Sequence, residues 1–255
     1  MKLTPLKVFF AYISVVLICA VIYVSVPEMF KDKITIGDGL YFSVVTITTL
    51  GYGDFSPISD SGKAVAAFEA FLGVVLMGLF LLSVSNQLIE KEERKRIDAA
   101  KENLKAQYRA WKRNVIYSLL FLSKPGKGVA SDLAEELTDA HRFRDYFKED
   151  NDARWCAIAN NLSSDSYYSK EIVHGLENLQ SQIEIFIASS RVGEAEVLKQ
   201  LTQYVNHLSS MRRRDLDDYD DQKGFMRALW SVLAQWDFSS GDHNKDILLD
   251  TIDKI

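Results

Sequence analysis

The sequence predicts an all-α protein in which two membrane-spanning helices, joined through a short re-entrant stretch, precede an all-helical domain. Two long apolar runs lie within the first 90 residues, a shorter apolar stretch separates them, and helical periodicity recurs in the remainder. Charge divides the chain at the same places. The net charge is about −2 over residues 1–90, about +7 over 91–128 and about −10 over 129–255, within a whole-chain value of −5.

The first apolar run extends from Val8 to Val26 without a charged residue. About 19 residues at 1.5 Å each cover the roughly 30 Å hydrocarbon core of a bilayer, which predicts a membrane span. The alternative is a cleaved signal peptide, because Lys2 and Lys7 precede the run. Its apolar core would be too long, and Ile18-Cys19 stands where small residues are expected at a cleavage site.

The second apolar run, Ala64–Ile89, carries a single charge and, at about 26 residues, must tilt in the membrane or project from it. A basic excess follows directly, over residues 91–113. Lys and Arg close to a span mark the cytoplasmic side, and Lys2 and Lys7 give the same side to the start of the first span. We therefore expect a multi-pass protein of the cell (inner) membrane with both termini in the cytoplasm.

A third apolar stretch, Leu40–Leu50, lies between the two spans and is too short to cross a bilayer. Backbone at membrane depth must be buried in protein or line a water-filled cavity, because lipid offers it no hydrogen bonds. One subunit with two spans cannot surround a pore. The sequence therefore predicts a symmetric homo-oligomer that encloses the cavity.

The re-entrant stretch ends in Thr48-Thr49-Leu50-Gly51-Tyr52-Gly53-Asp54. This string resembles the selectivity filter of the prokaryotic two-transmembrane-helix potassium channels, whose pattern is Thr-Val-Gly-Tyr-Gly, with Leu50 in place of Val. Residues 40–46 look like the pore helix of that family. The resemblance covers residues 1–90, about a third of the chain, and no family is recognised in the rest. It implies a homotetramer that conducts K⁺ passively, and no enzyme.

The resemblance also assigns roles to residues. Four copies of the backbone carbonyls of Thr49, Leu50, Gly51 and Tyr52 would replace the water shell of K⁺, and Gly53 would complete the ion-coordinating segment. Glycine adopts the required backbone conformations at little steric cost. Tyr52 would point away from the pore axis and brace the filter. K⁺ is the ion expected at this site, and no organic cofactor is expected. The expected filter-supporting residues are Thr48, Asp54 and Glu69.

Glu69 has two readings. An intramembrane carboxylate indicates a functional site by default, because a charge that faces lipid costs several kcal/mol. Close to the outer surface, however, it can reach water or bond to the pore helix without contacting an ion. We favour a bracing role.

Gly73 stands where the family has its gating hinge, counted from Asp54, and glycine weakens a helix locally by about 1 kcal/mol. Close helix packing is the alternative, since small residues permit it in membranes. We favour the hinge for Gly73 and packing for Gly78. The helical period from Gly73 predicts a cavity-lining face that contains Met77, Leu81 and Ser85.

Three domains are expected: a transmembrane pore domain over residues 1–90, a basic juxtamembrane helix or linker over 91–124, and an all-α cytoplasmic domain over 125–255. Lys124-Pro125-Gly126-Lys127-Gly128 supplies the break before the last domain. The seven-residue spacing of Ile97, Leu104 and Trp111 allows a short parallel bundle around the fourfold axis. Alternatively, the basic residues of 91–113 form a solvated face or contact anionic lipid headgroups.

The last domain shows three helical patterns, separated by breakers near 163–166, 193 and 239–241, and we expect about five or six helices. No dinucleotide-binding fingerprint and no nucleic-acid-binding feature is apparent, and the gating ligand or partner is unknown. The patterned residues are Ile172, Leu176, Leu179, Ile183 and Phe186; Leu198, Leu201, Val205 and Leu208; and Phe225, Leu229, Leu233 and Trp236.

The leading functional hypothesis is a potassium-selective channel closed at the inner helix bundle and modulated by the helical domain. A weakly selective cation channel is the first alternative, which Leu50 permits and Tyr52 argues against. A membrane-anchored sensor or interaction protein with a vestigial pore is the second.

Overall fold

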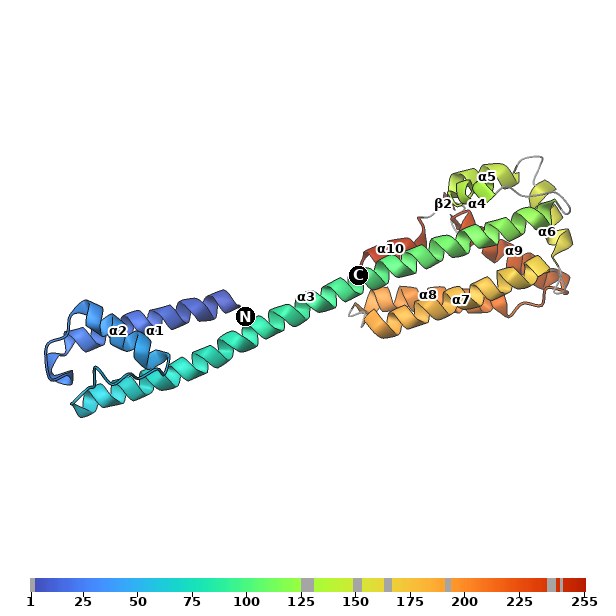
Figure 1. Ribbon diagram of the computed structural model, residues 1–255. Coiled ribbons are helices and arrows are strands. Elements are labelled where there is room, and N and C mark those ends of the chain that lie inside the picture. Colours follow the sequence, from blue (N-terminus) through green and yellow to red (C-terminus); the bar gives the residue numbers. More distant parts are fainter. Residues whose placement is uncertain are drawn as a thin grey trace. The chain divides into compact units, whose positions relative to one another are not determined.

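The computed structural model of the chain forms two compact units, Met1–Arg94 and Lys95–Ile255. Nearly all of its regular structure is helical, which confirms the all-α fold class (Figure 1). The exception is an antiparallel pair of two-residue strands, β1 (Trp236–Asp237) and β2 (Asp242–His243). The structure describes residues 3–124, 131–148, 153–162, 167–190, 194–237, 242–243 and 245–255.

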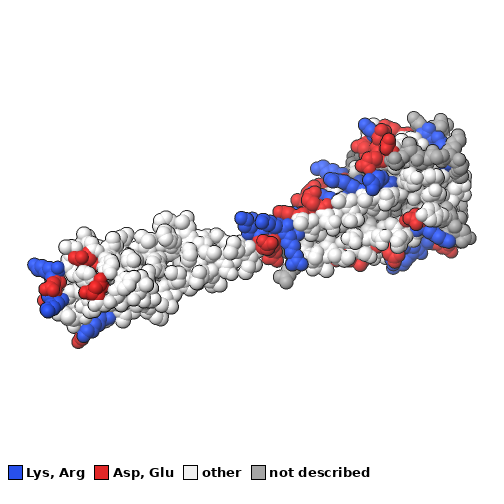
Figure 2. Space-filling view, viewed as in Figure 1, with Lys and Arg blue, Asp and Glu red and all other residues white. Residues whose placement is uncertain are grey.

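The first unit contains α1 (Pro5–Ser25), the 3₁₀ turn η1 (Pro27–Met29), α2 (Ile36–Ile47) and the beginning of α3 (Asp60–Ser123). In the described part of the chain, α1 and α3 are the two helices long and apolar enough to cross a membrane, and α2 is a shorter apolar helix. On the face that Figure 2 shows, the charges of this unit gather at its two ends and leave a long helical surface between them uncharged.

Helix α2 is packed closely against α1. A Cβ on Gly39 would lie 2.8 Å from Val24 Cγ2 and 3.1 Å from the carbonyl oxygen of Ala20, so glycine is needed there. The ring of Phe42 on α2 meets Tyr23 of α1 edge-on, with 4.9 Å between ring centroids. Phe30, after η1, also meets Phe42, at 5.1 Å. Such edge-to-face pairs add about 0.5–1.5 kcal/mol each to the burial of the rings, which fixes the short helix in place.

The second unit is built around the carboxyl-terminal part of α3, whose residues from Leu104 to Leu122 enter its apolar core. The boundary expected at Lys124 therefore differs from the structure, because residues 95–123 belong to the second unit. The residues after Lys124 in the predicted break lie outside the described ones. The other helices are α4 (Ser131–Glu136), α5 (Ala140–Lys148), α6 (Ala153–Asn161), α7 (Tyr167–Ser190), α8 (Ala195–Arg212), α9 (Tyr219–Leu233) and α10 (Ile247–Asp253).

Two of the three heptad-spaced residues pack in the core of their own subunit. Leu104 and Trp111 are only 2% and 6% exposed within the core of the second unit, so they are not available for a parallel bundle between subunits. Ile97 is half-buried. A seven-residue spacing also describes two turns of an ordinary helix, and here that face packs against the chain's own helices.

The three predicted helical patterns correspond to α7, α8 and α9. The α7 pattern is confirmed, since all five of its residues are buried. On α8 the buried face is shifted: Leu198 is 38% exposed, while Val197, Tyr204 and Met211 are buried with Leu201 and Leu208. Trp236 lies in β1, beyond the end of α9. With four further short helices, the described part of residues 125–255 contains seven helices, more than the five or six expected. The three predicted breakers lie outside the described residues.

A buried ion pair joins α3 to the start of α10. Lys112 and Asp246 form a salt bridge with side chains only 7% and 10% exposed, and Lys112 Nζ lies 4.6 Å from the ring centroid of Tyr108. Asp246 also accepts a hydrogen bond from the backbone N–H of Leu249, which caps α10. The Tyr204 hydroxyl donates to that of Tyr108 at 3.4 Å, and burial raises the pKa of both phenols.

Other residues of the basic stretch also pair within the second unit. Lys105 Nζ lies 2.6 Å from Asp253 Oδ1, and this carboxylate raises the pKa of Lys105. Arg113 lies 3.5 Å from Glu135. Since Lys112 is nearly inaccessible, the expectation that the whole 91–113 stretch forms a solvated or lipid-contacting face does not fit its carboxyl-terminal part.

Removing one partner of the Lys112–Asp246 pair leaves the charge of the other partner buried. We expect Lys112→Met to destabilise the second unit by about 3–5 kcal/mol, because Asp246 would stay desolvated without a counter-charge. Lys112→Met/Asp246→Asn should recover part of the loss. The measurement is the thermal unfolding of the solubilised chain, with Lys199→Met, which removes an exposed pair with Glu196, as the near-neutral control. Equal stability of Lys112→Met and Lys199→Met would contradict this account.

Candidate functional site

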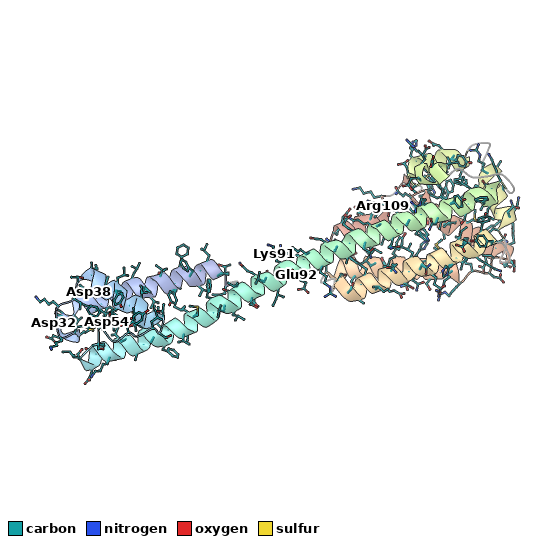
Figure 3. The ribbon with its side chains drawn as sticks, in the orientation of Figure 1. Asp32, Asp38, Asp54, Lys91, Glu92 and Arg109 are labelled. Carbon is teal, nitrogen blue, oxygen red and sulfur yellow. The ribbon has the colours of Figure 1, made fainter. Side chains whose placement is uncertain are left out.

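The candidate site lies at the end of the first unit that holds the connecting loops. Asp32, Asp38 and Asp54 lie at one end of this unit, and Lys91 and Glu92 lie at its other end (Figure 3). The chain therefore enters α2 and leaves the segment after it at the same end, as a re-entrant stretch does.

Helix α2 starts with a capping box. The Asp38 backbone N–H donates to Thr35 Oγ1 at 3.3 Å, and the Thr35 backbone N–H donates to Asp38 Oδ2 at 2.8 Å. A capping box satisfies N–H groups that the first helical turn leaves without partners. It fixes where α2 starts, and thereby where its carboxyl end lies.

The carboxyl end of α2 closes with a left-handed residue. The N–H of Thr49 donates to the carbonyl of Thr46 at 2.9 Å, and the N–H of Leu50 donates to the carbonyl of Val45 at 3.0 Å. Thr49 itself has φ 62°. This hydrogen-bond pair with a left-handed residue is the Schellman arrangement, in which glycine is the usual residue. A threonine there costs about 1–2 kcal/mol of backbone strain, which suggests a functional requirement.

The left-handed conformation then recurs at every second residue. Thr49, Gly51 and Gly53 have φ of 62°, 51° and 78°, whereas Leu50 and Tyr52 between them do not have positive φ. Alternation between opposite-handed conformations turns successive peptide groups toward one side, whereas successive carbonyls of a β-strand point to opposite sides. A segment of this kind can present a column of carbonyl oxygens.

In the segment 49–53, the side chains of Leu50 and Tyr52 are not covered by described residues of their own chain. Leu50 is 58% exposed and Tyr52 is 68% exposed. The described part of this chain does not supply the packing expected of Tyr52, and that packing stays a prediction. Thr48 Oγ1 donates to the carbonyl of Val44 at 2.6 Å, and Asp54 Oδ1 accepts from the N–H of Phe55 at 3.1 Å. Both bonds are local, and the support role of these two residues stays a prediction.

Glu69 joins three helices. It is fully buried on α3, where Oε2 accepts a 2.7 Å hydrogen bond from the Tyr23 hydroxyl of α1 and Oε1 lies in hydrogen-bond contact with the Ser43 hydroxyl of α2. Ser43 Oγ is also 3.0 Å from the carbonyl oxygen of Val16. A buried carboxylate satisfied in this way ties α2 to both long helices. Of the two readings of Glu69, this geometry favours bracing, through hydroxyl groups instead of the backbone.

Sequence reasoning did not identify Tyr23 and Ser43. The available signal was weak, because a hydroxyl in an apolar run is common and nothing in the one-dimensional pattern aligns residues on three helices. The physical requirement that a buried carboxylate find donors was the one usable clue.

Gly73 is needed for close packing. A Cβ there would overlap the carbonyl oxygen of Ile47, the last residue of α2, and would lie 2.8 Å from Ile47 Cγ1. Around Gly78, by contrast, a Cβ would meet no described atom of the chain within 4 Å. The structure thus gives a packing contact to Gly73 and none within the subunit to Gly78, the reverse of the preference from sequence. The hinge at Gly73 stays a prediction.

The expected cavity-lining residues lie on an uncovered part of α3. Met77 is 46% exposed, Leu81 is 61% exposed, and Ser85 is exposed. The described part of the chain leaves this face largely uncovered. Lining a cavity is compatible with that exposure.

Loss of the Glu69 carboxylate should leave the buried Tyr23 hydroxyl without a partner, while Ser43 keeps the carbonyl of Val16 as its acceptor. We expect Glu69→Ala to lower stability by about 1–3 kcal/mol for this unsatisfied group and to loosen the attachment of α2. Glu69→Gln, whose amide oxygen can still accept from Tyr23, should be milder. Melting temperature of the solubilised protein measures the difference, with Glu28→Ala, outside this cluster, as the control. A stability loss no larger for Glu69→Ala than for Glu28→Ala would speak against the bracing role.

Comparison with known proteins agrees with this geometry over the same stretch. Residues 10–90 match the family model described as ion channel. Two pore potassium channel b of Oryza sativa subsp. japonica is 50% identical over 72 residues, which cover 28% of this chain and 21% of the relative. Two-pore potassium channel 1 of Arabidopsis thaliana is 45% identical over 56 residues, covering 22% and 15%.

Potassium voltage-gated channel subfamily A member 10 of Homo sapiens is 38% identical over 80 residues, covering 31% of this chain and 16% of the relative. The chain thus spans about a fifth or less of the length of these relatives. No solved structure matches the chain significantly. Over residues 10–90, the part that holds α1, α2 and the left-handed alternation after α2, this chain is similar to the ion channel family and to potassium channels of plants and animals.

Proposed function

We propose that this chain is one subunit of a homotetrameric potassium channel that conducts K⁺ passively and selectively. The observation that supports it most is the alternation of left-handed backbone at Thr49, Gly51 and Gly53 directly after a capped apolar helix. Such a segment can present carbonyls in series, and a closed ring of four copies would turn single carbonyls into complete coordination shells.

In this proposal the carbonyls of Thr49, Leu50, Gly51 and Tyr52 coordinate K⁺, and the Thr49 hydroxyl adds the innermost ring. K⁺ gives up its hydration shell only where protein oxygens take the places of the water oxygens and attract the ion about as strongly. The carboxyl end of α2 adds the negative end of its helix dipole, which favours a cation. Thr48, Asp54 and Glu69 would keep these carbonyls in register by holding the segment's ends and the helix behind it.

The remaining roles follow from placement on α3. Met77, Leu81 and Ser85 would line the inner cavity, and the inner helix bundle would close it. The Lys and Arg residues after Ile89 would mark the cytoplasmic side of the membrane. With two spans, as in the prokaryotic family that the chain resembles, both termini would then lie in the cytoplasm. The domain plan becomes a pore unit and a helical cytoplasmic unit, and most of the basic helix belongs to the second of them.

Reconstitution in liposomes tests the proposal. With an outward K⁺ gradient, we expect K⁺ flux with little Na⁺ flux, from particles with the mass of four chains of 28.9 kDa each. Equal fluxes of the two ions would favour the weakly selective cation channel. Absence of flux under all conditions, or a monodisperse monomer, would favour the membrane-anchored protein with a vestigial pore.

We further propose that the second unit modulates opening. Helix α3 runs without interruption from Asp60 to Ser123, so residues of the proposed inner helix and core residues of the second unit belong to one element. A domain biases an open–closed equilibrium only through interactions that differ between the two states.

A chain that ends at Arg94 removes the second unit at its structural boundary. An end at Arg113 would expose core residues such as Leu104 and Trp111. We expect the shorter channel to have a changed open probability with nearly unchanged single-channel conductance and K⁺ selectivity, measured in planar bilayers. Loss of K⁺ preference in the shorter channel would show that the second unit takes part in selection.

A further inference from the structure

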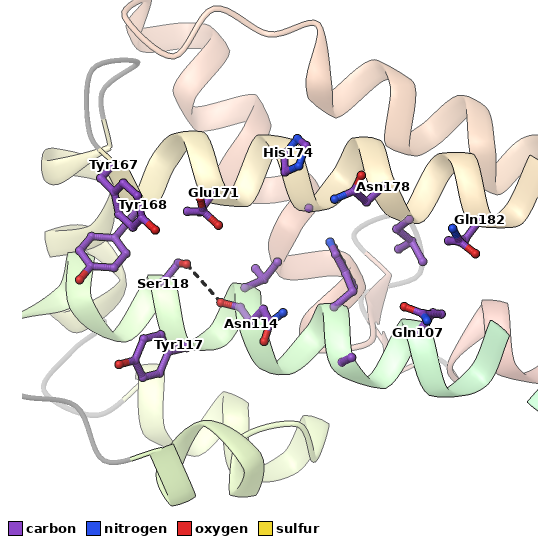
Figure 4. Close-up of a pocket in the computed structure, with 15 residues that line it drawn as sticks. Gln107, Asn114, Tyr117, Ser118, Tyr167, Tyr168, Glu171, His174, Asn178 and Gln182 are labelled. Atoms are coloured by element: carbon purple, nitrogen blue, oxygen red, sulfur yellow. Dashed lines mark hydrogen bonds between the residues drawn. The ribbon is translucent and has the colours of Figure 1, made fainter. Parts of the chain in front are cut away.

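A pocket of about 400 Å³ lies in the second unit between α3 and α7 (Figure 4). The two helices approach closely at Gly175, where a Cβ would lie 3.3 Å from Trp111 Cδ1 and 3.4 Å from Trp111 Nε1. Figure 4 shows polar side chains of both helices facing this space, from Gln107 to Ser118 on α3 and from Tyr167 to Gln182 on α7. The volume suits a small molecule.

Trp111 supplies a buried donor without a partner. Its side chain lines the pocket and is only 6% exposed, and its Nε1–H finds no acceptor among the described residues. The indole N–H is a donor only, and a buried donor left unsatisfied costs about 1–3 kcal/mol. Most buried polar groups have partners, so this N–H is a donor that an acceptor on a bound molecule could satisfy.

One end of the pocket is suited to a cation. Tyr117, Tyr167, Tyr168 and Glu171 gather there, from both helices (Figure 4). The lining residues include the Glu171 carboxylate and no Lys or Arg. Phenol rings attract a cation through their negative faces, and a carboxylate adds a full opposite charge. An anion would meet this carboxylate, and the one basic side chain among the lining residues is the imidazole of His174.

Four of the other lining residues carry groups that both donate and accept. Gln107, Asn114, Asn178 and Gln182 carry amides that can bond to hydroxyl or carbonyl groups of a ligand (Figure 4). The buried Ser118 hydroxyl is already used, because it donates to the carbonyl of Asn114 at 3.2 Å. The pocket therefore combines a cation-binding end with an oxygen-binding interior.

We propose that this pocket binds a small organic ammonium compound that also carries an oxygen acceptor. Its ammonium group lies between Glu171 and the tyrosine rings, and its oxygen accepts from Trp111 Nε1. The site stands apart from the proposed conduction of K⁺, because all its residues belong to the second unit. Binding and flux are measured independently, so either can fail without the other.

Isothermal titration of the solubilised full-length chain with choline tests this, since choline has a quaternary ammonium group and a hydroxyl. We expect one equivalent bound per chain at constant KCl concentration. The neutral isostere 3,3-dimethyl-1-butanol, which replaces the ammonium nitrogen with carbon, should bind at least about tenfold more weakly, and Glu171→Gln should weaken choline to a similar degree.

Two further variants complete the test. Trp111→Phe keeps a ring and loses the N–H, so it should weaken choline while its melting temperature reports whether the core is intact. Glu184→Gln removes an exposed carboxylate of the same helix outside the pocket and should leave binding unchanged. The proposal is overturned if choline does not bind, if the neutral isostere binds equally well, or if Glu171→Gln and Glu184→Gln behave alike.

Discussion

Gly53→Asp is expected to abolish the preference for K⁺ over Na⁺ while leaving the subunit folded. Gly53 has φ 78°, and no described atom of its own chain lies within 4 Å of the position where a Cβ would be, so within the subunit the change acts on backbone conformation and charge and not through a clash. A side chain disfavours this left-handed conformation. One ring of carbonyls would lose its geometry, and four carboxylates would be added beside the ions.

We expect the K⁺/Na⁺ permeability ratio to fall by at least about tenfold, equivalent to about 1.4 kcal/mol, as measured by reversal potentials under bi-ionic conditions. Gly37→Asp is the matched control, because it places the same charge on the first turn of α2 at a glycine without positive φ. An unchanged ratio in Gly53→Asp would refute the assignment of the 49–53 segment as the selectivity filter.

Gly73→Ala and Gly78→Ala are expected to change stability in opposite directions. Alanine normally gains about 1 kcal/mol over glycine inside a helix. At Gly73 the added methyl group would overlap Ile47 and force α3 away from the end of α2, at about 1–3 kcal/mol per subunit. At Gly78 it meets no described atom of its own chain, and the gain should remain.

Melting temperature and the fraction of tetramer in detergent measure this difference, and single-channel recording adds the functional consequence. Because Ile47 immediately precedes the 48–53 segment, we also expect Gly73→Ala to disturb conduction. If Gly73→Ala assembled with unchanged stability and altered only open probability, a hinge would explain this glycine better than packing would.

The first unit could be predicted from the sequence to a large extent. Long runs with at most one charged residue determine the two long apolar helices, since only a helix satisfies the backbone, and only apolar side chains suit hydrocarbon. The short stretch between them, observed as α2, follows from the same constraint. The periodicity of α7 was equally readable, because its buried residues are all strongly apolar. On α8, where Tyr204 and Met211 share the buried face with leucines, the apolar pattern is broader and allowed a wrong phase.

The sequence by itself thus determined the all-α class, the two long apolar helices and the 49–53 segment, because these depend on local composition and on where glycine stands. Tertiary structure alone decided which partners residues have. It brought Tyr23 and Ser43 to Glu69, placed Ile47 against Gly73, and made the basic stretch after the second span part of a folded core through Lys112 and Asp246. These contacts join residues far apart in the chain, and no local pattern specifies them because burial and pairing depend on how helices pack.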